Sequence, residues 1–196
     1  MSHVNEAARH HEDYSKSQLG FWLYIMTDCI LFSVLFATYL VLLPNKNGGP
    51  GPSDLFSLPY VLAETMLLLT SSFTSGLALL AAHKNNVKQV LIWLGVTAAL
   101  GASFVAMKVV EFAKLVHEGH SWTSSAFMSG YFTLVGTHGL HVTIGLLWMI
   151  VLFFFVLKRG LINTSVKRLS LFSLFWHFLD IVWIFIFSVV YMIGAI

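Results

Sequence analysis

Charged residues are scarce in this chain of 196 residues. Asp, Glu, Lys and Arg together make up 10% of the sequence, whereas hydrophobic residues make up 57%. A water-soluble domain usually carries about 25% charged residues, so the composition excludes an ordinary soluble enzyme or binding domain. The net charge of +2 gives no support to a function in binding nucleic acid. The sequence therefore indicates an integral membrane protein with no nucleic-acid partner.

Cysteine and proline are also rare. Cys29 is the only cysteine, which excludes an internal disulfide and a metal site built from cysteines. Three of the four prolines lie within residues 44–54, together with glycine and asparagine. Because these residue types do not continue a helix, this segment is predicted to be a loop.

The chain contains five long apolar runs, which are not typical of a water-soluble domain. They cover roughly residues 19–43, 59–82, 89–112, 127–157 and 169–193. Each run supplies the roughly 20 helical residues that a membrane span needs. Short polar links join neighbouring runs, so successive helices are expected to be antiparallel. We therefore predict an all-α fold in which residues 19–196 form a bundle of five transmembrane helices, preceded by a cytoplasmic tail of residues 1–18.

The basic residues predict the orientation of this bundle. Because cytoplasmic loops are enriched in Lys and Arg, the side with more of them is assigned to the cytoplasm. One side carries eight: Arg9, Lys16, Lys84, Lys88, Lys158, Arg159, Lys167 and Arg168. The other side has Lys46 and Lys114, with Lys108 near its boundary. We predict a cytoplasmic N-terminus, an external C-terminus and, since the tail has no apolar stretch, a first span inserted without a cleaved signal.

Several ionisable residues lie within the predicted spans, where polar groups are costly and usually functional or structurally paired. Counting residues from each helix end places one set in the middle and cytoplasmic half of the membrane: Asp28, His138, His141, His177 and Asp180. A second, shallower set lies near the external ends of two helices: Glu64, Lys108 and Glu111. These eight residues are the candidate site residues.

Each set is open to more than one interpretation. His138 and His141 are three residues apart on one helical face, so they could bind a metal or hydrogen-bond neighbouring helices. A haem would need a further histidine on an opposing helix, which His177 could supply, whereas a di-iron site would need more histidines than these three. Asp28 and Asp180 could relay protons or form structural hydrogen bonds. For Lys108 and Glu111, a local ion pair is favoured over a transport pathway.

Small and polar residues predict which helical faces pack inward, because small side chains let membrane helices approach closely. In the third run this face is defined by Gly95, Ala99, Ala102 and Ala106. In the second run it is defined by Glu64, Ser71, Ser75 and Ala78. We expect both faces to lie inside the bundle.

Three segments resemble subunit III of the haem-copper terminal oxidases. They are GFWLYIMTDCILF at 20–32, GTHGLHVTIG at 136–145 and WHFLDIVW at 176–183, and the resemblance covers residues 19–194. The first segment and SLFWHFLD at 173–180 are most similar to the cytochrome bo-type ubiquinol oxidase branch. Many relatives among the cytochrome c oxidases have seven helices, and this chain lacks the first two.

The resemblance implies roles for the candidate residues. Subunit III of this family carries no haem or copper, which are held by subunit I, so the histidines are expected to be structural and the chain to hold no cofactor or metal. Asp28 stands at the position of a buried family carboxylate that is often glutamate. Glu111 matches a family glutamate, while Lys108 stands where some relatives have glutamine.

The resemblance also implies a function. We expect an accessory, non-catalytic subunit of a proton-pumping ubiquinol oxidase that reduces oxygen to water in a bacterial cytoplasmic (inner) membrane. The chain would stabilise subunit I and support proton uptake, with subunit II, a small subunit IV and membrane phospholipid as further partners. The alternatives are subunit III of a cytochrome c or menaquinol oxidase and an independent membrane oxidoreductase that binds b-type haem.

Overall fold

The fold consists of helices throughout the residues that the structure, a computed structural model, describes: 2–44, 58–119 and 123–192. The helices are α1 (Ser2–Leu42), α3 (Leu58–His83), α4 (Val87–His117), α5 (Ala126–Arg159) and α6 (Asn163–Ile186), which continues directly into the π-helix η1 (Phe187–Met192). Within the described ranges there is no strand. The predicted all-α fold is confirmed.

Five helical segments are long and apolar enough to cross a membrane. They are Lys16–Leu42, Leu58–His83, Val87–His117, Ala126–Arg159 and Thr164–Met192. Each one coincides with a predicted span to within a few residues, and the chain is thus a multi-pass membrane protein. Most of the predicted loop at 44–54 lies outside the described residues.

The first helix begins earlier than the apolar pattern predicts. Residues 2–18, which belong to the predicted cytoplasmic tail, are helical, and α1 runs without a break from Ser2 to Leu42. The physical reason is that residues 2–19 contain no proline or glycine that would end a helix. The first span is therefore the C-terminal part of a longer helix.

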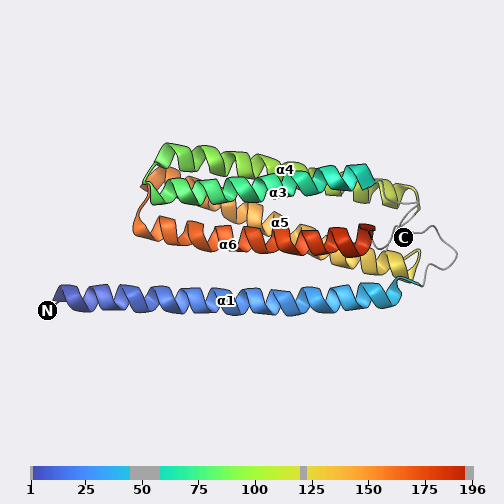
Figure 1. The fold of residues 1–196 in the computed structure, drawn as a ribbon, viewed down its shortest axis with the longest axis horizontal. Coiled ribbons are helices and arrows are strands. Elements are labelled where there is room, and N and C mark those ends of the chain that lie inside the picture. The colour runs from blue at the N-terminus through green and yellow to red at the C-terminus, as the bar shows by residue number, and fades with distance from the viewer. Residues whose placement is uncertain (1, 45–57, 120–122, 193–196) are drawn as a thin grey trace.

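The helices lie side by side, and α3, α4, α5 and α6 alternate in direction along the bundle (Figure 1). The α6 helix contacts both α3 and α5, whereas α1 lies at the edge against α5 and α6. The start of α1 and the end of η1 are at opposite ends of the bundle (Figure 1). An odd number of spans requires this placement.

Two tryptophans attach α6 to its neighbours. The Trp176 indole nitrogen donates a hydrogen bond to Ser71 Oγ (3.1 Å), and the Trp183 indole nitrogen donates one to Thr65 Oγ1 (3.1 Å). Both acceptors belong to α3. The Trp176 ring also fills the space beside two glycines, since a Cβ atom at Gly101 of α4 or Gly145 of α5 would lie 2.9 Å from it. Trp176 therefore contacts three helices at once.

The predicted inward faces are right for one helix and wrong for another. On α3, Ser71, Ser75 and Ala78 are buried as expected. On α4, however, Ala99, Ala102 and Ala106 are exposed. The side of α4 that packs against the other helices carries Val90, Leu94, Thr97, Gly101, Phe104 and Lys108. Small residues allow close approach but do not specify the partner, so the α4 face could not be chosen from them.

Candidate functional site

Five side chains from three helices and η1 form one buried polar cluster, called here the lysine cluster: Glu64, Lys108, Glu111, Tyr131 and Tyr191. The Lys108 ammonium lies 2.7 Å from Glu64 Oε2, forms an ion pair with Glu111 Oε2, and donates to the Tyr191 hydroxyl at 3.1 Å. The side chains of Lys108, Glu64 and Glu111 are only 6%, 0% and 11% exposed. The three residues predicted as a shallow layer are thus in direct contact.

Two tyrosines complete the lysine cluster. The Tyr131 hydroxyl donates to Glu111 Oε1 at 3.2 Å, and the Tyr131 and Tyr191 hydroxyl oxygens are 3.0 Å apart. The Lys108 ammonium also lies over the rings of Trp183 and Tyr191, at 4.9 and 5.2 Å from their centroids. Contact with aromatic faces stabilises a desolvated cation. Neither tyrosine was named from the sequence as a site residue, although Tyr131 near the start of α5 and Tyr191 near the end of η1 lie at the depth of Lys108.

Asp28 of α1 and His141 of α5 form a second polar contact. His141 Nδ1 pairs with the Thr137 carbonyl oxygen at 2.8 Å, and its other ring nitrogen lies 3.6 Å from Asp28 Oδ2. The carbonyl can only accept, so Nδ1 carries a hydrogen, and Nε2 is the nitrogen that faces the carboxylate. A separation of 3.6 Å is longer than a hydrogen bond, so the contact is electrostatic.

His138 lies apart from that pair and is surrounded by aromatic rings. Its ring is fully buried and stacks on Trp183, with centroids 5.3 Å apart and planes at 30°. Phe32 and Phe104 present edge contacts at 6.3 and 6.2 Å. Among the described residues, neither ring nitrogen has a hydrogen-bond partner.

Asp180 is buried on the side of α6 that faces α3, whereas the His177 side chain is exposed at the edge of the α3–α6 contact. His177 Nδ1 donates to the Ser173 carbonyl at 2.6 Å, and its Nε2 lies 4.0 Å from the position a Cβ atom would take at Gly76. Asp180 is buried and interacts with Ser72 of α3. The five residues placed at similar depth by the sequence are therefore divided between the α1–α5 contact, the aromatic core and the α3–α6 contact. In the part of the chain that the structure describes, no three His, Cys, Asp or Glu side chains are placed to hold a metal ion.

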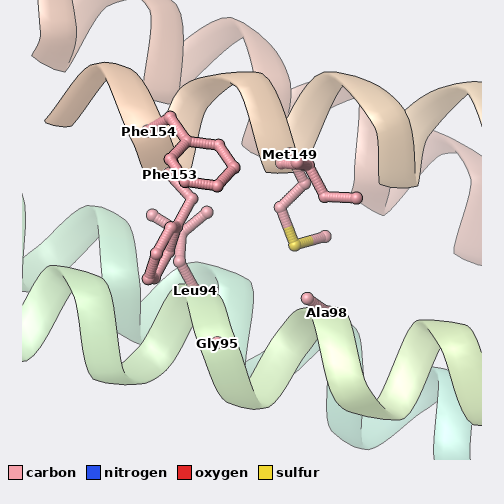
Figure 2. Close-up of a pocket in the computed structure, with 7 residues that line it drawn as sticks. Leu94, Gly95, Ala98, Met149, Phe153 and Phe154 are labelled. Atoms are coloured by element: carbon pink, nitrogen blue, oxygen red, sulfur yellow. The ribbon is translucent and has the colours of Figure 1, made fainter. Parts of the chain in front are cut away.

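Apolar grooves run between the helices. One of about 310 Å³ lies between α4 and α5, where Met149 and Phe153 point towards Ala98 and Leu94 (Figure 2). Another of about 510 Å³ lies between α1 and the α6–η1 helix, with Phe32, Phe36, Phe178 and Phe185 in its walls. Such walls suit acyl chains or apolar side chains of another helix. The predicted phospholipid remains a prediction.

Comparison with known proteins covers almost the whole chain. The family model described as cytochrome c oxidase subunit III matches residues 5–195. A protein of Pseudomonas aeruginosa named cytochrome bo(3) ubiquinol oxidase subunit 3 is 54% identical over 95% of this chain and 89% of its own length. Cytochrome c oxidase subunit 3 of Bacillus sp. (strain PS3) is 48% identical over 91% and 86%, and quinol oxidase subunit 3 of Bacillus subtilis is 47% identical over 90% and 86%.

Proposed function

The chain belongs to the cytochrome c oxidase subunit III family, and from that premise we propose that it serves a complex that oxidises ubiquinol. The chain is an oxidase subunit III. The observation that favours ubiquinol over another electron donor is the 54% identity, across 95% of the chain, with a relative named for that substrate. The segments at 20–32 and 173–180 point to the same branch.

Within the complex, we propose an accessory role. Most of the buried titratable side chains contact one another or nearby protein groups, as Asp28 does with His141 and Lys108 does with Glu64. Such pairing suits a scaffold that holds its own helices together. The chain would then bind the subunit that carries the haems and copper, together with the other subunits of the oxidase, in the inner membrane of a bacterium.

We further propose that Asp28 contributes indirectly to proton supply on the cytoplasmic side. Asp28 is 6% exposed, and the His141 Nε2 atom lies 3.6 Å from its Oδ2 atom. No continuous series of acids leads from it through the described helices, as an obligatory relay would require. Asp28 would therefore shape the charge near the proton entrance of the neighbouring subunit.

Copurification tests the assignment. The chain, tagged at one end and extracted in mild detergent, should bring down a haem-bearing subunit, and the complex should consume oxygen with ubiquinol as donor. A complex that oxidises cytochrome c but not ubiquinol would place the chain in the branch of the Bacillus sp. relative. A haem spectrum from the isolated chain would contradict an accessory role.

Asp28→Asn tests the contribution to proton supply. Because the proposed effect is indirect, the variant complex should keep its haem content and most of its initial rate of oxygen consumption, with a modest fall in sustained turnover. Initial and sustained rates are measured on the same purified complex. Loss of nearly all turnover in a complex with normal haem content would show that Asp28 is an obligatory proton carrier.

A further inference from the structure

The formal charges of the lysine cluster do not balance. Glu64 and Glu111 are two acids, and among the described residues Lys108 is the single base in contact with them. If both acids were ionised, the cluster would hold one net negative charge among helices that lie in hydrocarbon. Charges buried in an apolar medium are costly, and such groups usually neutralise by taking up a proton.

Glu111 is well stabilised as an anion. Its Oε2 atom is paired with the Lys108 ammonium, and its Oε1 atom accepts a hydrogen bond from the Tyr131 hydroxyl at 3.2 Å. Both carboxylate oxygens thus have a donor. The negative charge of the cluster is expected to remain on this residue.

Glu64 is stabilised less. Its Oε2 atom lies 2.7 Å from the Lys108 nitrogen, but neither of its carboxylate oxygens has a hydrogen-bond partner among the described residues, and the side chain is 0% exposed. The hydrogen bonds of Lys108 go to Glu111 and to the Tyr191 hydroxyl, and its contact with Glu64 is an ion pair at Oε2. Oε1 of Glu64 is therefore the position in the cluster where an anion is least supported.

We propose that Glu64 holds a proton at neutral pH, so that the lysine cluster is a proton-binding site made of a neutral carboxylic acid beside a Lys108–Glu111 ion pair. The other titratable groups near it are the phenols of Tyr60, Tyr131 and Tyr191, and the charge of Lys108 also acts electrostatically on His138. The site lies towards the end of the bundle where α3 begins. It is separate from the Asp28–His141 contact and does not depend on which electron donor the complex uses.

Infrared spectroscopy of the purified complete oxidase tests this site directly. At neutral pH the spectrum of the native complex should contain a carbonyl-stretching band of a protonated carboxylic acid that is lost in Glu64→Gln. Glu118→Gln is the matched control, because Glu118 is exposed and its charged partner among the described residues is the exposed Lys114, and it should leave the band unchanged. A Glu64→Gln spectrum that retains every protonated-acid band would overturn the proposal.

A second variant keeps the test decisive if Glu64→Gln does not assemble. In Glu111→Gln one acid faces one ammonium, so Glu64 should give up its proton and pair with Lys108, and the same band should disappear although Glu64 is present. Persistence of the band would refute the argument from charge balance.

If the native complex lacks the band but is stabilised against heat by added sodium or potassium ions, and Glu64→Gln is not, the site holds a metal cation and the proposal is wrong.

Discussion

The position of Trp176 depends on the absence of two side chains. Gly101 on α4 and Gly145 on α5 both face its indole ring, and neither has room for a methyl group. The ring is fully buried and its nitrogen is bound to Ser71. A shift of the ring away from either glycine would thus disturb its contact with α3 as well.

We expect Gly101→Ala and Gly145→Ala each to destabilise the subunit by about 1–3 kcal/mol, because overpacking a tight interior forces neighbouring groups to move. Gly95→Ala on α4 and Gly139→Ala on α5 are controls, since a Cβ atom at either position meets nothing within 4 Å. Thermal unfolding of the complex in detergent measures the difference. Equal effects in all four variants would show that the indole is not held by the two glycines.

His138 offers a contrasting case at the residue scale. It is buried among Trp183, Phe32 and Phe104, and its ring nitrogens have no partner in the described part of the chain. Because an unpaired buried polar group costs about 1–3 kcal/mol, His138→Phe should leave the stability of the complex unchanged or raise it, with normal haem content. His141→Phe should lower stability, since it removes the imidazole that faces the buried Asp28 carboxyl group. A fall in haem content in His138→Phe would support the ligand interpretation instead.

At the scale of elements, the lysine cluster joins α3, α4, α5 and η1 through polar contacts. Lys108 is the centre of these contacts, and its removal would leave Glu64 and Glu111 without a cation. Breaking a buried ion pair on one side usually costs about 3–5 kcal/mol. The four elements therefore depend on one side chain for their arrangement at this end of the bundle.

Lys108→Met should accordingly reduce the thermal stability of the complex strongly. Lys114→Met on the same helix is the matched control, because Lys114 is 73% exposed and lies 3.8 Å from an exposed Glu118. Exposed pairs contribute about 0–1 kcal/mol, so this variant should unfold close to the native temperature. Comparable losses in both variants would argue against a structural role for the buried cluster.

The sequence predicted the elements better than it predicted their contacts. Span length and residue depth follow from counting along the chain, which is why five helices and the layer of Glu64, Lys108 and Glu111 were found. The rotation of a helix about its own axis depends on which neighbours it packs against. The inward face of α4 was therefore predicted wrongly from the sequence alone. The sequence also did not show that Asp28 and His141 lie at one helix contact and His177 and Asp180 at another.

At the scale of the whole molecule, the basic residues of the loops gather at one end of the bundle. Lys84 and Lys88 flank the α3–α4 turn, and Lys158, Arg159, Lys167 and Arg168 surround the α5–α6 turn. Both turns lie at the same end in Figure 1. Because cytoplasmic loops carry the excess of Lys and Arg, we expect this end to face the cytoplasm.

Reporter fusions test that orientation. A reporter joined after Ile196 should show the activity typical of an external location, and one inserted within the α3–α4 turn should show cytoplasmic activity. Each fusion is a control for the other, because a failure to express one fusion protein would leave the reporter activity of the other unchanged. Cytoplasmic activity of the C-terminal fusion would overturn the proposed orientation of all five spans.

The two indole hydrogen bonds of α6 have a further consequence for how the helices fit together. Trp176 is bound to Ser71 and Trp183 to Thr65, so α6 is fastened to α3 at two points separated by about two turns. Sliding α6 by a single turn, about 5.4 Å, would break both bonds at once. Apolar side chains do little to prevent such slippage, because lipid solvates them equally well at any offset. The two indoles, together with the bond between Tyr191 and Lys108, thus set the axial register of the last span.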